Sequence, residues 1–535
     1  MRTAKEIIQR HDSLKSDRAN WESYWQNLSY YIMPHKAYFT KDRVSGEELP
    51  KDLYDSSAVY ANQVFAAGLH GYMTNPSSKW FTLRTQDNDI MEKKEVAVWL
   101  KKAEDKIYSV LNSSNFNQQI HEAYLDLGCL GTAVFYEEED ERDIVRFYAR
   151  QLSECYIAED ARERVNEVVR VFELTALQAR GKFGDKAGKS VLKALEKRDY
   201  TSKFTYYHAV FPRHDRNVSK KDAKNKKFAS IWVAKNEQKK VKEGGYDEFP
   251  YMAVRFSKTS DEVYGFSSGM VSFADIKMLN RMSKTTIKAG EKAVSPTIIL
   301  PHDGYVLPLD LRADKINYKR KRTSADEKIE TIPVGNVGLG LEMENQRRET
   351  IQKSFFVDLF LMLTSQKNMT ATEVNERVQE KMLVIGPILG RLMSELLDPI
   401  IFRTLLILIK GNHLPPAPAA IQGAMTEVEY VSPLAKAQKF SELNAINNTI
   451  GSVTQLAEGV PDIVDNYDMD EVAIEIGMIN GINPELRRDP KERDKIRKDR
   501  AEAQQAAAQM EMIQQGATAA KTGAEADAKN REGGV

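Results

Sequence analysis

The sequence contains very little cysteine. Only Cys129 and Cys155 occur among 535 residues, so a disulfide framework is excluded and we expect assembly in a reducing compartment. The chain also carries no net charge, because 77 lysines and arginines balance 77 aspartates and glutamates. This balance excludes the global basic field that many free DNA-binding proteins carry, so any contact with nucleic acid must be local.

Long apolar runs are missing as well. The most apolar stretch, residues 400–409, is about half of the roughly 20 residues that a membrane-spanning helix needs, and it contains Arg403. We therefore expect this stretch in the protein core or at a subunit interface. Residues 1–6 are charged and lack an apolar run, so neither a signal peptide nor a membrane anchor is expected.

Enzyme motifs are absent from the sequence too. Residues 184–190 come nearest to a nucleotide site, but a phosphate-binding loop needs four residues before Gly-Lys-Ser, and here there are three from Gly184 and six from Gly181. The closest histidines, His208 and His214, match no common zinc spacing. We predict no catalytic residue, no cofactor and no metal site, although a divalent-ion site built from carboxylates far apart in the sequence stays open.

What the sequence does contain is the pattern of a predominantly helical α+β protein, with room for about three or four domains. Residues 1–34 predict one helix with an aromatic face. Further helices are predicted at 56–75, 92–111 and 115–127. Strands are predicted at 132–136, 144–148, 168–174, 204–210, 228–234 and 251–256, with a helical insertion near 175–197. The acidic run 137–141 is predicted to be a solvated hairpin tip.

Two long helical patterns, residues 339–363 and 371–410, flank the short polar segment 364–370. Unbroken, they would span roughly 37 Å and 60 Å, which is long for a compact domain. Thr370 and Glu373 form a capping-box pattern at the start of the second helix. Helices of these lengths indicate a structural role for this region rather than a catalytic one.

Two prolines predict interruptions of the second helix. Gly386 and Pro387 predict a kink, because proline removes a backbone donor and crowds the carbonyl of the preceding turn. Asp398 followed by Pro399 predicts a second break, with the aspartate as an N-cap.

Positive charges recur at helical spacing in residues 267–293. They are four, three, four and four residues apart, which confines them to an arc of roughly 80°. This basic stripe consists of Lys277, Arg281, Lys284, Lys288 and Lys292. Two interpretations stay open: the stripe contacts phosphates without reading sequence, or it is solvated or pairs with acidic residues of a neighbouring subunit.

A second basic group lies among the short strands and turns predicted for residues 295–332. It consists of Lys319, Arg320, Lys321 and Arg322. After residue 411 a proline and alanine linker leads to helices predicted at 433–458 and 470–478. From residue 483 the chain is charged and then rich in alanine and glutamine, so it can bury little apolar surface, and we predict a mobile or partly helical tail.

Three blocks of sequence carry a family pattern. The first block is Trp21-x-x-x-Trp25 with Tyr30-Tyr31-x-x-Pro34. The second block runs from Ser57 through Asn75-Pro76-x-x-Lys79-Trp80-Phe81-x-Leu83. The third block begins with Phe355-x-x-Asp358-Leu359-Phe360 and continues through Met369-Thr-Ala-Thr-Glu-Val374, Gly386-Pro387 and Gly390-Arg391-Leu392. The third block is the most specific. Together with the order of elements, which covers roughly residues 1–480, they resemble the portal (head-to-tail connector) proteins of short-tailed bacteriophages.

This resemblance implies a ring-forming portal fold with wing, stem, clip and crown regions. By that similarity residues 1–266 form the wing, together with a kinked wing helix at 371–411. Stem helices at 267–293 and 338–363 flank a clip at 294–337. A crown at 412–484 is followed by the unmatched, flexible tail at 485–535. A tunnel loop at 364–370 would project into the channel; it comprises Thr364, Ser365, Gln366, Lys367, Asn368, Met369 and Thr370.

The resemblance also implies a function and a set of partners. The protein would be a structural, non-enzymatic ring, usually of twelve subunits, at one capsid vertex of the virion, assembled in the host cytoplasm. Double-stranded DNA would pass through it, with the terminase, tail adaptor proteins, and the major capsid and scaffolding proteins as partners. The alternatives are an ATP-driven DNA translocase or nuclease subunit, and another ring-forming tail adaptor.

Overall fold

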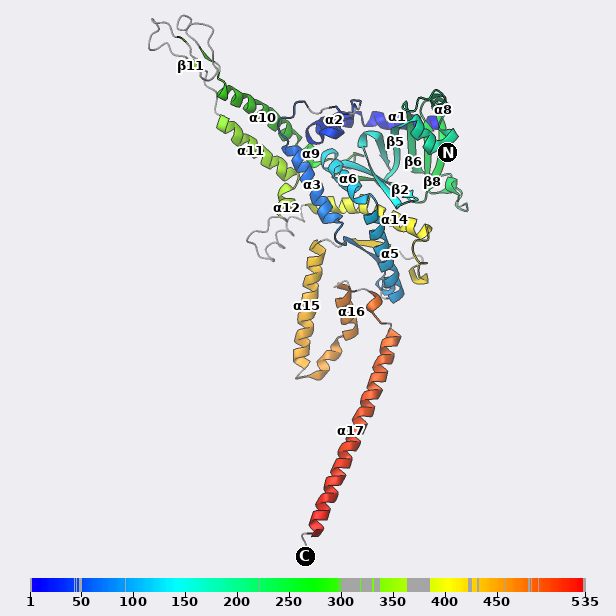
Figure 1. Cartoon of the computed structure of the whole chain (residues 1–535), viewed down its shortest axis with the longest axis vertical. Coiled ribbons are helices and arrows are strands. Elements are labelled where there is room, and N and C mark those ends of the chain that lie inside the picture. Colours follow the sequence, from blue (N-terminus) through cyan, green and yellow to red (C-terminus); the bar gives the residue numbers. More distant parts are fainter. Residues whose placement is uncertain are drawn as a thin grey trace. The chain divides into compact units, whose positions relative to one another are not determined.

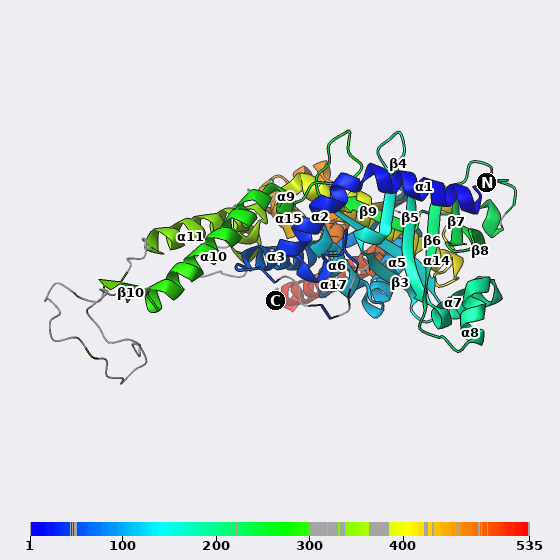
Figure 2. The same ribbon diagram turned by 90° about the horizontal axis from the view of Figure 1, so that it is seen from above.

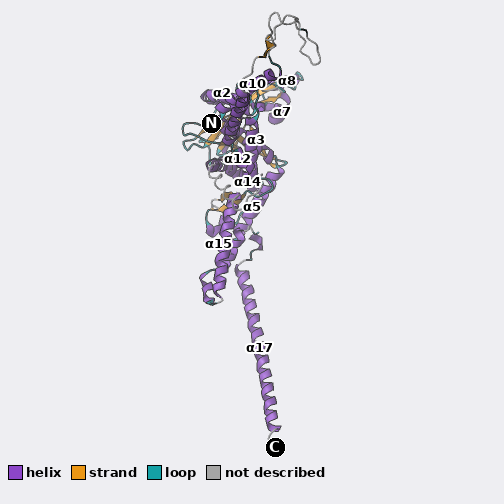
Figure 3. Ribbon diagram, turned by 90° about the vertical axis from the view of Figure 1, so that its left-hand side faces the viewer, coloured by secondary structure: helices purple, strands orange, loops and turns teal. Residues whose placement is uncertain are grey.

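The computed structural model has two compact units. Unit 1 comprises Met1–Phe81, Lys106–His413 and Tyr430–Ala435, and unit 2 comprises Thr82–Asp105, Leu414–Glu429 and Lys436–Val535. The described residues are 2–42, 44, 46–47, 51–91, 93–220, 222–296, 298–299, 318, 330–331, 337–362, 385–421, 426–430, 433–457, 459–479, 482, 484–488 and 490–532. Helices make up most of them, and strands form a smaller part (Figures 1 and 3), which confirms the predicted helical α+β class.

The predicted N-terminal helix is two helices, α1 (Ala4–Asp17) and α2 (Ala19–Ile32). They meet at Arg18, which is 1% exposed and donates hydrogen bonds to the backbone oxygens of Leu152, Ser153 and Cys155. These carbonyls lie far along the chain, so periodicity alone could not predict the break. The aromatic face of α2 packs inward as predicted, with Trp25 fully buried.

The helices predicted after α2 are confirmed with small shifts at their ends. They are α3 (Ser57–Met73), α5 (Lys94–Ser113) and α6 (Phe116–Leu130). Helix α6 ends at Gly131, whose φ of +75° and close approach to the Gly265 backbone leave no room for a side chain.

Two antiparallel sheets form the strand-rich part of unit 1. The three-stranded sheet has the order β3-β2-β9, and its strands are β2 (Thr132–Asp140), β3 (Ile144–Arg150) and β9 (Tyr251–Arg255). The five-stranded sheet runs β4-β5-β6-β7-β8, with β4 (Cys155–Glu159), β5 (Val165–Thr175), β6 (Lys203–Pro212), β7 (Phe228–Ala234) and β8 (Lys239–Tyr246). All six predicted strands are present. Within these two sheets the sequence missed two strands, β4 and β8, which are the edge strands of the five-stranded sheet. Strand β8 is rich in lysine and glycine, which are depleted in strands.

Helices cover both faces of the five-stranded sheet (Figure 2). On one face α1 contributes Ile7 and Leu14 to a core with Tyr207 and Ile231. On the other face α7 (Ala176–Phe183) and α8 (Lys189–Glu196) form a second core around Trp232. The predicted helical insertion thus covers a sheet face.

The prediction that residues 137–141 form a solvated tip is wrong for Glu137. Its backbone pairs with Phe147 in β3, and its side chain is fully buried. Thr404 donates a hydrogen bond of 2.9 Å to Glu137 Oε1, and Arg403 Nε lies 3.9 Å from Oε2. Burial raises the pKa of Glu137 from 4.5 to about 8, although Arg403 and Thr404 act in the opposite sense. The exposed tip of the β2–β3 hairpin therefore begins after Glu137.

The second predicted stem helix is also interrupted. Helix α11 (Val337–Ser354) ends one turn before α12 (Val357–Met362) begins, and Phe356 between them has φ of +57°. A left-handed conformation is strained for a bulky residue. The amide of Phe356 bonds to the carbonyl of Lys353, and its own carbonyl accepts the amide of Phe360. A single residue thus redirects the chain, and phenylalanine gives no local signal for it.

Phe356 offers a test of this strain. Phe356→Gly should raise the free energy of unfolding by about 0.5–1 kcal/mol, because glycine adopts the left-handed region freely. Lys353→Gly, three residues earlier within α11, should lower it by about 1 kcal/mol. Urea unfolding followed by tryptophan fluorescence measures both values, and a loss of stability in both variants would contradict the assignment.

The helix predicted at 371–411 is described from residue 385 onward. Residues 385–392 are helical, a wider π-type turn follows at Met393–Leu397, and α14 spans Asp398–Lys410. The predicted break at Asp398 is wrong, because Leu397 and Asp398 both keep helical angles and the π turn accommodates Pro399. Residues 400–409 pack in the core, as predicted: Ile400, Ile401 and Leu408 are fully buried.

Unit 2 contains two of the predicted crown helices, α15 (Pro433–Ala457), most of which lies in this unit, and α16 (Met469–Ile479). Within the unit, Trp99 Nε1 donates a 2.9 Å hydrogen bond to the carbonyl of Pro415. The predicted partly helical tail is one helix in the structure, α17 (Pro490–Glu532). Its alanine, glutamine, lysine, arginine and glutamate residues have high helix propensity, which outweighs their inability to form a core.

Candidate functional site

Helix α10 (Phe273–Val294), which follows the short α9 (Ser268–Val271), lies beside α11 and forms a hairpin with it (Figures 1 and 2). These are the helices predicted to form the stem, and we call the pair the stem hairpin. A polar seam joins the two helices. Glu344 of α11 is 2% exposed and accepts hydrogen bonds from Ser283 Oγ at 3.3 Å and from Arg348 Nη2 at 2.9 Å. Arg347 Nη1 pairs with Asp275 Oδ1 at 2.9 Å. Charged and hydroxyl groups therefore hold the hairpin together.

The segment before α3 anchors the base of this hairpin. Arg348 also donates to Asp55 through Nε at 3.0 Å and Nη2 at 2.9 Å. Asn280 accepts the amide of Tyr54 at 2.7 Å and donates to the carbonyl of Asp52 at 3.0 Å. Such two-point contacts fix direction as well as distance, so they orient the hairpin on unit 1.

The basic stripe lies along α10 as the spacing predicted. Lys277, Arg281, Lys288 and Lys292 are exposed, and Lys284 is half-buried with its Nζ 5.0 Å from the Tyr54 ring centre. Within the described residues no carboxylate forms an ion pair with any of the five. Among the described residues the charge of the stripe is therefore uncompensated by ion pairs.

Several predicted site residues lie outside the described residues. These are the tunnel loop, Thr364 to Thr370, and the basic group Lys319 to Arg322. The described chain reaches Met362 before the loop and resumes at Ile385 after it. Gly386 and Pro387 are helical, but residues 363–384 before them are not described, so the kink stays a prediction.

A buried charge cluster that the sequence did not reveal holds the π turn to the sheets. Arg255 of β9 is 2% exposed and donates to Glu395 from its backbone amide at 2.9 Å, from Nε at 3.0 Å and from Nη2 at 2.6 Å. It also pairs with Glu159, which Lys258 contacts at 3.1 Å. The partners are 140 residues apart in sequence, so only an arginine within an apolar strand pattern could have hinted at them.

Beside this cluster is a cavity of about 800 Å³. Phe249, Met252, Pro387 and Pro399 give it apolar walls, and Arg162, Arg164 and Arg391 are among its polar lining residues. Glu163, Glu395 and Asp398 also line the cavity, and the Glu395 carboxylate is bound by Arg255. The cavity lies beside the π turn, and we interpret it as a structural feature of the fold.

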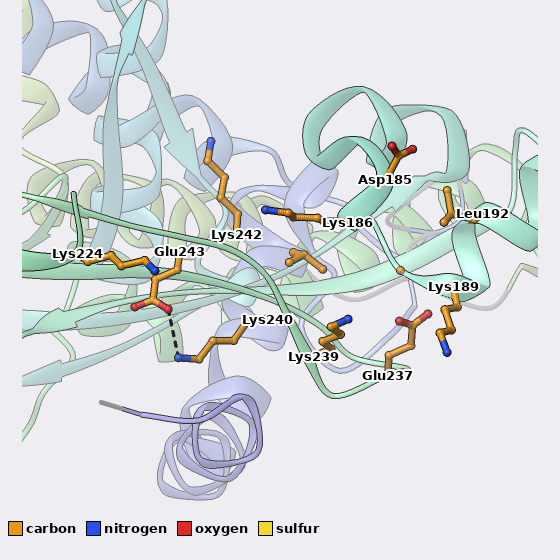
Figure 4. Close-up of a pocket in the computed structure, with 12 residues that line it drawn as sticks. Asp185, Lys186, Lys189, Leu192, Lys224, Glu237, Lys239, Lys240, Lys242 and Glu243 are labelled. Carbon is orange, nitrogen blue, oxygen red and sulfur yellow. Dashed lines mark hydrogen bonds and ion pairs between the residues drawn. The ribbon is translucent and has the colours of Figure 1, made fainter. Parts of the chain in front are cut away.

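The segment that came nearest to a nucleotide site forms the turn between α7 and α8. Glu237 accepts hydrogen bonds from the amide of Ser190 at 2.8 Å and from its hydroxyl at 3.3 Å. A carboxylate thus already occupies the position at the start of α8 that a phosphate would need. The adjoining pocket of about 430 Å³ is lined by Lys186, Lys189, Lys239 and Lys242, among others (Figure 4).

His208, one of the two histidines considered as a zinc pair, is bound by protein side chains. His208 is fully buried, stacks on Trp232 and bonds to Ser230 and Tyr251, and burial lowers its pKa well below the ordinary value. No group of three metal-binding side chains occurs among the described residues. In the same described ranges, no helix is both long enough and apolar enough to cross a membrane.

Comparison with known proteins identifies the family of the chain. Residues 4–487 match the family described as bacteriophage head to tail connecting protein. The chain belongs to this family. This connector protein is 32% identical over 528 residues to the probable portal protein of Bordetella phage BPP-1, a match that covers 97% of the chain and 95% of the relative. It is 31% identical over 529 residues to the portal protein of Salmonella phage epsilon15, with the same coverage.

The family and these relatives confirm the resemblance drawn from the three sequence blocks. The connector is a structural portal protein and a virion component at the head–tail junction. The prediction that it is not an enzyme is confirmed, because its relatives are structural portal proteins and not members of an enzyme family. The stem hairpin and the buried anchors are therefore parts of a portal.

Proposed function

We propose that copies of this connector form a closed ring of twelve subunits at one capsid vertex, and that double-stranded DNA passes through its axial channel during packaging and ejection. The single observation that carries this proposal is the stem hairpin in a portal-family chain. Its large apolar side chains Met278, Ile287, Leu341 and Met343 are 39–47% exposed, which is what a surface buried by neighbouring subunits needs.

The basic stripe, which forms no ion pair with the described residues, supports the same proposal. Lysine and arginine side chains attract the phosphate backbone without reading its sequence, and such contacts permit DNA to slide. The chain as a whole is neutral, so the attraction stays confined to the stripe. In a ring, one stripe per subunit becomes a set of cationic tracks along the stem.

The regions of the chain have distinct roles in this proposal. The clip, residues 294–337 with its group Lys319 to Arg322, contacts the terminase motor first and tail adaptor proteins later. The stem, residues 267–293 and 338–363, surrounds the channel. The wing, residues 1–266 and 371–411, and the crown, residues 412–484, face the major capsid and scaffolding proteins, and assembly takes place in the host cytoplasm.

Electron microscopy of the purified full-length protein tests the ring. We expect particles with an axial hole, and native mass spectrometry should give twelve copies of the 60.8 kDa chain. A protein that stays monomeric at every concentration, together with virions that lack a ring at the vertex, would overturn the proposal.

The tunnel loop yields a sharper prediction. One Lys367 per subunit makes a ring of cations, so Lys367→Ala should reduce the yield of particles holding full-length DNA several-fold, because each subunit loses a phosphate contact. Lys367→Arg keeps the charge and should behave like the natural protein. Gel sizing of DNA released from purified particles measures the effect, and equal genome length and yield in the alanine variant would refute this role.

A further inference from the structure

Lysines from several elements converge on the pocket of about 430 Å³ beside α8 and β8 (Figure 4). Among the described residues, six lysines line it: Lys186, Lys189, Lys224, Lys239, Lys240 and Lys242. They come from the short helix η3 (Gly184–Lys186), the start of α8, the short helix η4 (Ala223–Asn225) and β8. We call this hollow the lysine pocket. A hollow lined by charges of one sign concentrates their field and attracts the opposite charge.

The three carboxylates of the lysine pocket already have partners. Glu237 accepts two hydrogen bonds from Ser190 at the start of α8. The ion pairs of the other two carboxylates are Asp185–Arg180 at 3.0 Å, Glu243–Arg213 at 3.5 Å and Glu243–Lys240 at 3.4 Å. Within the described residues no carboxylate pairs with the remaining five lysines. The described part of the subunit therefore does not balance their charge.

Protection of a sheet edge explains only part of this arrangement. Strand β8 is an edge strand, and lysines on such a strand hinder its pairing with other chains. That reason does not apply to Lys186, Lys189 and Lys224, which lie on other elements. The register between β7 and β8 also shifts between Trp232 and Val233, and a bulge of this kind re-aims side chains and is frequent next to active sites.

The lining of the pocket determines which anion fits. Lysine binds phosphate as a point charge, and the described lining residues include no aromatic ring on which a nucleobase could stack. One phosphate group carries a charge of about −2 at most, which is less than the charge of five lysines. The volume lies within the range of about 300–1,000 Å³ that is common for small-molecule sites. We infer that the lysine pocket binds a ligand that carries several linked phosphate groups.

Ammonium groups make the contacts in this site. The amides at the start of α8 do not take part, because Glu237 occupies them. Two sources supply linked phosphates: a free condensed phosphate, and the backbone of a nucleic acid. Basic residues outnumber acidic ones by more than two to one in residues 176–246, although the whole chain is neutral, so the surrounding surface attracts either source.

Inorganic tripolyphosphate and a DNA duplex of random sequence are the two probes. Isothermal titration calorimetry of the purified full-length protein should show saturable binding of tripolyphosphate at one site per chain. Lys186→Gln combined with Lys242→Gln removes one charge from the η3 side and one from β8. This pocket variant should bind tripolyphosphate at least about ten-fold more weakly, because two charge-assisted contacts are lost.

The matched control is Lys193→Gln combined with Lys235→Gln. Both lysines are exposed, one on α8 and one in the turn between β7 and β8, and neither lines the pocket. The control variant has the same net charge as the pocket variant, and its affinity should change by less than about two-fold. If urea unfolding shows that the pocket variant is destabilised, Lys189→Gln combined with Lys239→Gln repeats the test with two other lysines of the pocket.

The second probe distinguishes the two sources of phosphate. Binding of the duplex is measured with the same variants at about 0.1 M salt. If the pocket variant weakens the binding of tripolyphosphate alone, the ligand is a free condensed phosphate. If it weakens the binding of the duplex as well, or of the duplex alone, the ligand is the backbone of a nucleic acid.

Two results would overturn the inference. One is that neither probe loses more affinity in the pocket variants than in the control variant, which would mean that only diffuse charge attracts anions. The other is that polyglutamate competes as well as tripolyphosphate, which would mean a general basic surface without preference for phosphate. Neither result depends on ring formation, so the proposed portal function is tested separately.

Discussion

Arg255→Met is expected to lower the free energy of unfolding by about 2–3 kcal/mol, because it removes the buried cation that binds Glu395 and Glu159 and leaves these carboxylates only Arg391 and Lys258. Arg255, whose side chain is 2% exposed, makes three hydrogen bonds to Glu395 and pairs with Glu159, and both carboxylates are only partly exposed. Methionine replaces the volume of the side chain but none of these bonds. Urea unfolding of the purified protein, followed by tryptophan fluorescence, measures the loss.

The matched control for Arg255 is Arg162→Met, an exposed arginine that lines the same cavity. It should change stability by less than about 0.5 kcal/mol. Combining Arg255→Met with Glu395→Gln should recover part of the loss, since one uncompensated charge is removed. A loss below about 1 kcal/mol in Arg255→Met would mean that the π turn is held by packing instead.

Glu137→Gln is expected to abolish a pH dependence of stability. Burial raises the pKa of Glu137 from 4.5 to about 8, so between these values the folded protein holds a proton that the unfolded chain has released. Stability is therefore fully present below about pH 4.5 and falls as the pH rises through about 8, with a limiting slope of about 1.4 kcal/mol per pH unit. Glutamine cannot release the proton, so this slope disappears.

Unfolding free energies at several values between pH 5 and pH 8 test this expectation. Glu139→Gln, two residues further along β2 and exposed, removes a carboxylate from the same strand and should keep the slope of the natural protein. If Glu137→Gln and the natural protein show parallel curves, Glu137 is ionised in the folded state and its pairing with Arg403 outweighs burial.

The periodicity of the sequence correctly predicted helices and strands whose pattern of buried residues is set within the element itself. The strand predicted at 228–234 matches β7, and the basic stripe lies on one face of α10. Prediction failed where a distant partner decides the outcome. The backbone carbonyls that bind Arg18 determine the break between α1 and α2. The contacts of Glu137 with Thr404 and Arg403 stabilise its side chain in a buried position.

The candidate site shows the same limit. Three sequence blocks were enough to indicate the family, because they preserve residue identities and not only hydrophobicity. The Arg255–Glu395 contact could not be predicted, since each residue taken alone resembles an ordinary surface charge. Phe356 is the extreme case, because its left-handed conformation contradicts the helical pattern on both sides.

The polar seam between α10 and α11 has a mechanical consequence. Two helices joined by a close-packed apolar core can slide past each other only by opening voids. Ser283, Glu344 and Arg348 can instead exchange their mutual hydrogen bonds for hydrogen bonds to water, with a small net change in free energy. Glu344 Oε1 has no hydrogen-bond partner within the described residues, so an acceptor is already free for a shifted register. A small shift of α10 along α11 would therefore exchange polar partners and would not need to open voids.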